Sequence, residues 1–238
     1  MEIIPAIDLV GGKCVRLYQG DYAKETCYGD PLSIAKGYEE AGIKRLHLVD
    51  LDGAKGDGIV NLSVLRSITE QTSLVVDFGG GIKSREQLER AFDSGASMVT
   101  CGSIAVKDKD AVLSWGDVFG RERLIIGCDA SDGFVATNGW KTVTRTTVSD
   151  LVGFYWNKGF KRYICTDIAK DGTMTGPSFG LYQTLMKSFS GICLIASGGV
   201  SSMDDLVRLE TEGLSGAIVG KALLEGSITV RQLADWGR

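Results

Sequence analysis

Two aspartates stand at the ends of short apolar runs and are the leading candidates for acid–base chemistry. Asp8 ends the run at residues 2–8, and Asp129 ends the run at residues 124–129. A carboxylate on each side of a bound substrate suits proton removal on one face and proton delivery on the other. The chain has one histidine, which excludes a His-rich metal site and leaves carboxylates as the main acid–base groups. The alternative interpretation is a pair of strand-end caps or an ion pair.

Two glycine-rich turns follow apolar runs, and each precedes a segment with helical spacing. Bare backbone amides in such turns can approach phosphate oxygens, helped by a helix N-terminus. The next run in each case ends in a second short loop, which completes a two-loop cup. The first cup is Gly79, Gly80, Gly81, Gly102 and Ser103, and the second cup is Ser197, Gly198, Gly199, Gly220 and Lys221. One glycine turn alone is more typical of tight packing, but two complete cups predict a ligand with a phosphate at each end. A side chain at Gly80 or Gly199 is then expected to block phosphate binding by one of the two cups.

Four other polar or aromatic residues lie near the predicted strand ends. Thr166 ends a run and Asp171 follows it, so either can support the acid, with a purely structural role as an equal alternative. Alternation counted from Asp50 points His47 away from the strand ends, which favours a packing role by pattern alone. Trp140 lies in a polar loop, where its indole can close over a flat heterocycle or act as a core anchor.

The elements that must position these residues alternate strictly along the chain. Eight apolar runs are predicted strands, at residues 2–8, 45–50, 74–77, 98–101, 124–129, 162–166, 192–197 and 217–219. Eight segments with helical spacing follow them, at residues 31–41, 61–70, 84–94, 108–115, 148–158, 178–187, 202–212 and 223–236. Ser84 and Ser202 are typical helix N-caps. Eight βα repeats predict an α/β fold, the closed (β/α)8 TIM barrel, in which loops after the strands form the active-site face.

An internal repeat divides the predicted barrel into two halves. The run ending at Asp8 resembles the run ending at Asp129, and the first cup resembles the second in the same order and at nearly constant offset. Repeated units in order indicate a duplication. No Ser/Gly linker separates the halves, so we expect one barrel domain over residues 1–238, with half-barrels of about 1–120 and 121–238.

Composition limits the partners. The chain of 238 residues is 44% hydrophobic and 24% charged, with a net charge of -4 and no basic cluster, which argues against nucleic acid. Six cysteines without a CxxC pair give no metal site, and we expect no metal and no cofactor. No apolar run reaches 18 residues and no signal-peptide pattern opens the chain, so we expect no membrane partner and a cytoplasmic location. The expected partner is a small molecule, and the expected state is a monomer.

Several motifs spread along the chain can be taken together. They are Ala6-Ile7-Asp8-Leu9, Val15-Arg16-Leu17-Tyr18-Gln19-Gly20-Asp21-Tyr22, His47-Leu48-Val49-Asp50-Leu51-Asp52-Gly53-Ala54, the Gly79 turn, Asn138-Gly139-Trp140 and Thr166-Asp167-Ile168-Ala169-Lys170-Asp171-Gly172-Thr173. In this order they resemble one enzyme family, the phosphoribosylformimino-aminoimidazole carboxamide ribotide isomerases of histidine biosynthesis, and the resemblance runs from the first predicted strand to Gly220. It implies an Amadori rearrangement that converts the aminoaldose bisphosphate ProFAR to the aminoketose PRFAR, through ring opening and an enolamine, without a cofactor.

The resemblance also implies catalytic roles. Asp8 matches the base that takes the C2 proton, and Asp129 matches the acid that assists opening of the ribose ring, supported by Thr166. Asp171 competes with Asp129 for the acid role in some relatives.

Substrate contacts are implied at Arg16, His47 and Trp140, which overrides the packing interpretation of His47. Lys83, also implied as a substrate contact, stands where arginine is frequent, and a lysine ammonium does not form the bidentate contact of a guanidinium. Asn138 stands where relatives that also isomerise the tryptophan-pathway substrate carry arginine, which argues against dual activity.

Two alternatives come from other classes. The sister cyclase of the same pathway is a lyase that works with a glutaminase subunit and shares the duplicated barrel, but Ala6, Leu9 and Arg16 favour the isomerase. A noncatalytic phosphosugar-binding barrel is the other alternative. The presence of both strand-end aspartates, Asp8 and Asp129, argues against it.

Overall fold

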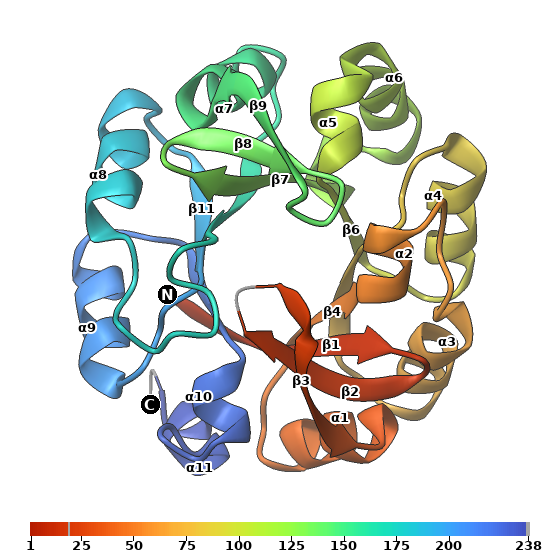
Figure 1. Cartoon of the computed structure of the whole chain (residues 1–238), viewed down its shortest axis with the longest axis vertical. Helices are drawn as coiled ribbons and strands as arrows, with labels where there is room; N and C mark the ends of the chain where they lie inside the picture. Colours follow the sequence, from red (N-terminus) through yellow and green to blue (C-terminus); the bar gives the residue numbers. More distant parts are fainter. Residues whose placement is uncertain (19, 237–238) are drawn as a thin grey trace.

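The barrel is formed by eight parallel strands whose first and last members pair with each other. The computed structural model describes residues 1–18 and 20–236. Around the barrel the strand order is β1, β4, β5, β6, β7, β10, β11 and β12, and β12 pairs with β1 to close the ring. An outer ring of helices surrounds the strands (Figure 1). The predicted (β/α)8 barrel is therefore confirmed. The strands are β1 (Glu2–Val10), β4 (Arg45–Asp50), β5 (Val75–Gly79), β6 (Met98–Cys101), β7 (Leu124–Ser131), β10 (Arg162–Asp167), β11 (Cys193–Ser197) and β12 (Gly216–Val219).

Seven helices of the outer ring agree closely with the predicted segments. They are α1 (Pro31–Glu40), α3 (Leu62–Gln71), α4 (Arg85–Asp93), α6 (Lys109–Phe119), α7 (Val148–Trp156), α8 (Phe179–Ser188) and α9 (Met203–Thr211). Ser84 accepts a hydrogen bond from the Gln87 amide, and Ser202 forms a capping box with Asp205, which confirms both predicted N-caps.

The predicted last helix, residues 223–236, is wrong as a single element. It consists of α10 (Lys221–Leu224) and α11 (Val230–Ala234). Gly226 has φ +76°, a left-handed conformation that ends the first helix, and Thr229 starts the second with a capping box to Gln232. Short segments between the larger elements were not predicted either. They are α2 (Leu51–Lys55), α5 (Ser103–Lys107) and the 3-10 turn η1 (Arg121–Arg123).

Two antiparallel hairpins stand beside the barrel mouth, and the sequence patterns did not predict them. The strand β2 (Lys13–Tyr18) pairs with β1 and with β3 (Asp21–Gly29). On the opposite side, β8 (Phe134–Thr137) pairs with β7 and with β9 (Thr142–Thr147). Figure 1 shows the two hairpins facing each other across the opening. Gln19, part of the β2–β3 motif quoted above, lies outside the described residues.

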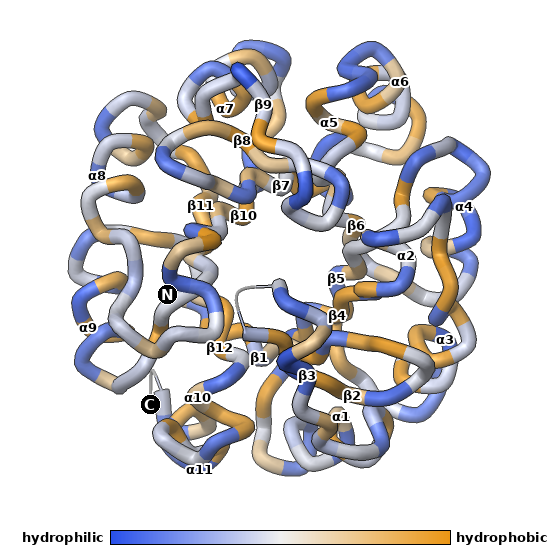
Figure 2. The backbone as a smooth tube through the Cα atoms, viewed as in Figure 1, coloured by the Kyte–Doolittle hydropathy of each residue, from blue (hydrophilic) through white to orange (hydrophobic). Residues whose placement is uncertain are grey.

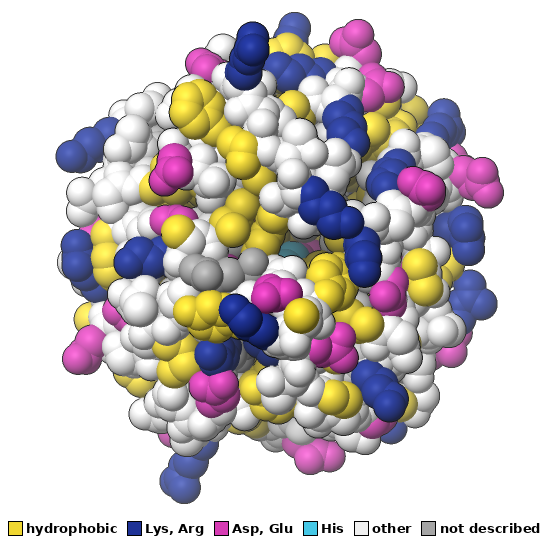
Figure 3. Space-filling view, in the orientation of Figure 1, with side chains coloured by type: hydrophobic (Ala, Val, Ile, Leu, Met, Phe, Trp, Pro, Cys, Tyr) yellow, Lys and Arg dark blue, Asp and Glu magenta, His cyan; other side chains and the backbone are white. Residues whose placement is uncertain are grey.

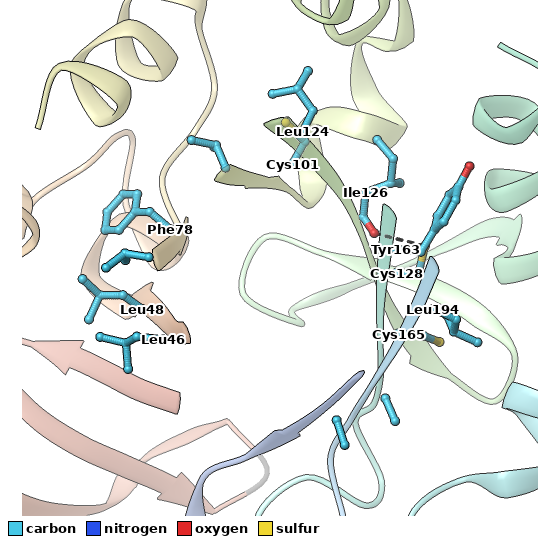
Figure 4. Close-up of a cluster of buried hydrophobic side chains, with 14 of the residues drawn as sticks. Leu46, Leu48, Phe78, Cys101, Leu124, Ile126, Cys128, Tyr163, Cys165 and Leu194 are labelled. Carbon is cyan, nitrogen blue, oxygen red and sulfur yellow. Dashed lines mark hydrogen bonds between the residues drawn. The ribbon is translucent and has the colours of Figure 1, made fainter. Parts of the chain in front are cut away.

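Most of the core lies between the strands and the helices. Figure 2 shows hydrophobic residues along the barrel strands, with hydrophilic residues concentrated toward the outside. Figure 4 shows part of this layer, in which alternate residues of six neighbouring strands point outward, among them Leu48, Phe78, Ile126 and Tyr163. Each of these four side chains is fully buried. Burial of one such side chain stabilises the fold by about 1.5–3 kcal/mol.

A second, smaller apolar cluster fills the inside of the barrel. Its buried members are Ile4, Ala6, Ile125, Ile164, Ile195 and Ile218. These side chains come from the inward-facing positions of β1, β7, β10, β11 and β12. The barrel interior is therefore packed, and polar side chains of the same inward-facing rows lie above this plug, at the mouth.

The two halves of the barrel carry matching features. In each half the first strand is followed by an antiparallel hairpin, the third by a glycine turn, and the fourth by a short helix, α5 or α10. The duplication of half-barrels 1–120 and 121–238 stays a prediction, which these correspondences support. Within the described residues, no helix has both the length and the apolar character that crossing a membrane requires.

Candidate active site

A pocket opens at the carboxyl ends of the barrel strands. Figure 3 shows the hollow in the middle of this face. All residues predicted to bind or transform the substrate line this one pocket, from strand ends and loops far apart in sequence. They are Asp8, Arg16, His47, Gly79, Gly80, Gly81, Lys83, Gly102, Ser103, Asp129, Trp140, Thr166, Asp171, Ser197, Gly198, Gly199, Gly220 and Lys221. Their shared location follows from the barrel, while their individual roles stay predictions.

Asp8 and Asp129 lie on opposite sides of this mouth. Asp8 is on β1 and Asp129 is on β7, the fifth strand counted around the ring from β1. Both side chains occupy inward-facing positions and line the pocket. A molecule bound between them is therefore exposed to one carboxylate on each face.

Arg16 links two of the pocket carboxylates. From β2 its Nη1 donates to Asp8 Oδ2 and its Nη2 donates to Asp171 Oδ1, each at 2.5 Å. The three side chains are only 11–14% exposed, so these charge-assisted bonds are shielded from water. The guanidinium thereby holds the Asp8 side chain, which lines the pocket, in one orientation.

Asp129 has a different environment, made of neutral donors. The indole Nε1 of Trp140 donates to Asp129 Oδ2 at 2.8 Å, and the Thr166 hydroxyl is a second hydrogen-bond partner. Burial raises the pKa of Asp129, against the lowering effect of these two hydrogen bonds and of the His47 charge. Burial also raises the pKa of Asp171, against the lowering effect of Arg16. Asp171 is paired with the Arg16 guanidinium, whereas Asp129 accepts hydrogen bonds from the neutral donors Trp140 and Thr166. Asp129 is therefore the better candidate to carry a proton.

Trp140 lies at the mouth rather than in the core. Its backbone is left-handed, with φ +67°, in the β8–β9 turn. A Cβ atom at Gly20 would come within 2.6 Å of the indole Cε3, so the ring packs directly against the tip of the opposite hairpin. The indole therefore spans the two hairpins beside Asp129, which favours the predicted cover over a flat ligand rather than a core anchor.

The prediction that His47 points away from the mouth is wrong. It was counted from Asp50, which is fully buried and faces outward, where its carboxylate accepts hydrogen bonds from the backbone of Gly53, Val60 and Asn61. His47 and Val49 have the inward parity, and both line the pocket. The substrate-contact position implied by the family resemblance is the one that agrees with this geometry.

Asp77 was missed altogether by the sequence reasoning. It lies on β5 directly beside His47 in the sheet register, is fully buried, and hydrogen-bonds through Oδ1 to His47 Nδ1. The signal in the sequence was a charged residue at the end of the apolar run 74–77, followed by Phe78 and with no obvious partner. A buried carboxylate requires a paired cation or several hydrogen bonds, so a charged residue in such a run indicates a local network.

The two cups lie at the edges of the pocket, but their glycines are constrained by the fold as well. A Cβ at Gly80 would lie 2.1 Å from the Asp50 carbonyl oxygen, and one at Gly199 would lie 2.4 Å from the Gly176 carbonyl oxygen. Both glycines have positive φ, +91° and +84°. Substitution there would distort the backbone, so a variant at either glycine does not test ligand binding alone. The expectation that it blocks one cup stays a prediction. A Cβ at Gly102, by contrast, meets open space.

Each cup also contains the start of a short helix, and a pocket-lining lysine belongs to it or lies beside it. Gly102 precedes α5 and Gly220 precedes α10, and among the described residues no side chain caps either helix start. The first backbone amides of these helices are therefore open to an acceptor. Lys83 Nζ donates to the Gly56 carbonyl, and Lys221 Nζ donates to the Gly172 carbonyl at 2.9 Å. Both lysines thus hold a loop beside the pocket and place positive charge at its edge.

No group of three or more His, Cys, Asp or Glu side chains within residues 1–18 and 20–236 has an arrangement that could hold a metal ion. All six cysteines are free, four of them buried, one half-buried and Cys27 exposed.

A closed barrel with carboxylates on opposite sides of its mouth defines the class: this is a (β/α)8-barrel enzyme with its active-site face at the carboxyl ends of the strands. The profile of the histidine biosynthesis protein family matches residues 2–229, and the chain belongs to this family. The resemblance inferred from the motifs is thereby confirmed.

Curated relatives match nearly the whole chain. A protein from Bacteroides thetaiotaomicron is 49% identical over 234 residues, 98% of each chain. Proteins from Flavobacterium johnsoniae and Cytophaga hutchinsonii are 49% and 50% identical over 237 residues, 99% of each chain. All three bear the name 1-(5-phosphoribosyl)-5-((5-phosphoribosylamino)methylideneamino) imidazole-4-carboxamide isomerase.

Proposed function

We propose that this protein catalyses the Amadori rearrangement of ProFAR to PRFAR in histidine biosynthesis. The observation that carries the proposal is the placement of Asp8 and Asp129 on opposite strands of one mouth. The two cups at the edges of the same pocket fit a substrate with a phosphate at each end. The name of the relatives, which contains two 5-phosphoribosyl groups, supports the same substrate.

The acid acts first. Asp129 protonates the ribose ring oxygen as the bond from this oxygen to C1 breaks, and the amine nitrogen supplies the electrons for a C1–N double bond. The raised pKa of Asp129, caused by burial, keeps the carboxyl protonated to higher pH than usual. Thr166 and Trp140 hold the carboxyl in place through their hydrogen bonds. Asp171 is the alternative acid, disfavoured because Arg16 pairs with it.

The base acts on the opened sugar. Asp8 removes the proton from C2, and the electrons of that bond form the enolamine. Delivery of a proton to C1 and loss of the proton from the C2 hydroxyl then give the aminoketose, so the net reaction is an isomerisation with no other reactant. Arg16 orients Asp8 for the proton transfer through its hydrogen bond.

Phosphate binding by the cups positions the sugar. The first cup and the second cup grip the two ends of the ligand, and the second grip becomes intramolecular once the first is made. Lys83 and Lys221 add positive charge at the two edges. Misplacing the sugar by about 1 Å would move C2 away from Asp8 and slow the reaction by roughly a hundredfold.

The direct test is incubation of the purified chain with ProFAR, with and without ammonia. Isomerisation without a change of mass and without a need for ammonia is expected, whereas ammonia-dependent cleavage would identify the cyclase activity. Binding without turnover would identify a noncatalytic phosphosugar-binding barrel.

A variant at Asp8 tests the assignment of the base. Asp8→Asn should bind the substrate nearly normally but lower turnover by roughly 10²- to 10⁴-fold, the contribution of a positioned general base. Asp132→Asn, in the β7–β8 turn, is the matched control that removes a negative charge outside the pocket-lining residues. Near-wild-type turnover of Asp8→Asn would remove Asp8 from the mechanism.

We further propose that the protein acts as a monomer in the cytoplasm. All predicted site residues come from one chain, and large exposed apolar side chains come from different parts of the chain, for example Val60, Val118, Phe134 and Val207. Six free cysteines suit a reducing compartment. Light scattering at working concentration should give the mass of one chain, and a dimer mass would overturn the monomer.

A further inference from the structure

Beneath the pocket floor, a charged network crosses three strands of the barrel. His47 Nδ1 hydrogen-bonds to Asp77 Oδ1, and Arg45 Nε and Nη2 approach Asp77 Oδ2 at 3.3 and 3.2 Å. Arg45 Nη1 then donates to Glu2 Oε2 at 2.6 Å, at the far end of the barrel. Asp77 is fully buried, Arg45 is 4% exposed, and His47 alone reaches the pocket. The mechanism proposed above uses none of these charges.

The network fixes the proton on one ring nitrogen of His47. Arginine keeps its charge in proteins, so Arg45 holds Asp77 as a carboxylate, and a carboxylate can only accept. Nδ1 of His47 must therefore be the donor to Asp77. The other ring nitrogen, Nε2, has no hydrogen-bond partner within the described part of the chain, and the ring lines the pocket. Whether Nε2 also carries a proton depends on the charges around the ring.

The charges facing His47 are mainly negative. Asp77 faces it from β5, Asp8 from β1 and Asp129 from β7, while the positive charge of Arg45 on its own strand acts in the opposite direction. Arg16 lies on β2 and is already paired with Asp8 and Asp171. Burial lowers the pKa of His47, but the charge of Asp77 and its hydrogen bond outweigh it, and the pKa of His47 is raised. The same contact and Arg45 lower the pKa of Asp77, against the raising effect of burial.

We propose that Asp77 is a positioning residue which, anchored by Arg45, keeps His47 doubly protonated and directs Nε2–H into the pocket as a hydrogen-bond donor. The class of acceptor is an oxygen of the sugar chain held between the two cups, so this part rests on the proposed function. A donor below the sugar stabilises negative charge on an oxygen as C2 changes from an alcohol carbon to a carbonyl carbon. Asp77 touches no substrate in this scheme and acts only through His47.

The single histidine of the chain makes the charge state directly measurable. In tag-free protein labelled with ¹⁵N-histidine, NMR follows the protonation of both ring nitrogens of His47 without substrate. We expect wild-type His47 to remain an imidazolium at neutral pH. A neutral ring at neutral pH with an unprotonated Nε2 would overturn the proposal without any variant. Because this readout needs no turnover, it stays informative if the proposed isomerase activity fails.

Asp77→Asn then tests the source of the effect. The amide oxygen can still accept from Nδ1 but carries no charge, so the pKa of His47 should fall by about one to three units, the usual effect of one adjacent opposite charge. Glu2→Gln is the matched control, since it removes a charge that contacts Arg45 and not His47. An unchanged titration of His47 in Asp77→Asn, or an equal shift in Glu2→Gln, would overturn the proposal.

Turnover separates positioning from damage to the fold. If Asp77 acts through the charge of His47, the activity of Asp77→Asn relative to wild type should fall as pH rises through the new pKa of His47 measured by NMR. Lowering the pH below this pKa should restore most of the relative activity. A loss of equal size at every pH would mean that Asp77 has only a structural role.

Discussion

The hydrogen bond between Trp140 and Asp129 gives the sharpest quantitative prediction for the proposed acid. Trp140→Phe keeps an aromatic ring against Gly20 but removes the Nε1–H that donates to Asp129 Oδ2 at 2.8 Å. A hydrogen bond to a charged group contributes about 1.5–3 kcal/mol net. Because one pKa unit corresponds to about 1.4 kcal/mol, the pKa of Asp129 should rise by roughly one to two units. The Thr166 hydrogen bond remains and limits the change.

The pH dependence of kcat/KM measures this shift. A general acid must be protonated in the free enzyme, so activity falls as pH rises through the pKa of Asp129, which burial already raises. In Trp140→Phe this alkaline limb should move to higher pH by the same one to two units, even if KM increases through lost contact with the ligand. Trp156→Phe, on helix α7 and outside the pocket, is the matched control and should leave the limb in place. An unmoved limb in Trp140→Phe would refute either the acid role of Asp129 or the importance of this hydrogen bond to its ionisation.

Three further predictions follow from the rest of the pocket. Arg16→Met leaves Asp8 and Asp171 without their cation. The free energy of unfolding, measured by urea denaturation, should fall by up to about 3–5 kcal/mol, the range for a broken buried ion pair. An unchanged free energy of unfolding would contradict the shielding of these ion pairs from water. Ser103→Asp and Lys221→Asp each place a carboxylate at the first residue of a helix, α5 or α10, where a negative charge is compatible with the helix. Each variant should raise KM by at least about tenfold, because the carboxylate repels the substrate phosphate. An unchanged KM in either variant would contradict phosphate binding by both cups at once. Activity should be unaffected by a strong chelator, and activity lost to EDTA and restored by a divalent ion would contradict the carboxylate-only mechanism.

The barrel was predictable because each of its strands is a short, apolar run that can be recognised from its own residues. Each buried strand of a parallel sheet reads as a continuous hydrophobic run, and helices with N-caps such as Ser84 and Ser202 follow at regular intervals. The cups were predictable for a similar reason, since glycine at a strand end is visible in the sequence. The sequence alone could not show whether a glycine in a cup is required by the fold or by the ligand. At Gly80, left-handed φ and contact with the Asp50 carbonyl already require glycine.

The two hairpins were missed because their stability is not local. Most residues of β3 are exposed, and its strand conformation comes from pairing with β2 rather than from an apolar pattern. In β9 only half-buried and exposed residues occur. A strand of this kind has no hydrophobic periodicity, so pattern analysis assigns it to a loop. Trp140 and Arg16 lie on these hairpins, which is why their directions could be obtained only from the family resemblance or from the structure.

The aspartates at strand ends show most clearly where sequence reasoning stops. Asp8 and Asp129 face inward and line the pocket, whereas Asp50 and Asp167 end the next strand in each half and do not. Asp50 binds the backbone of Gly53 and Asn61, and Asp167 binds the Ala169 amide and the Ser178 hydroxyl. All four residues look alike as a carboxylate after an apolar run. Side chains alternate between the two faces of a strand, and the face decides between the two roles. A carboxylate that faces inward lines the pocket, and one that faces outward accepts hydrogen bonds from the loop around it. Whether a residue faces inward must be counted from a residue of known direction. Counting from Asp50, which faces outward, placed His47 on the wrong side of the strand. Counting from Asp8 across the parallel register would have placed His47 in the pocket.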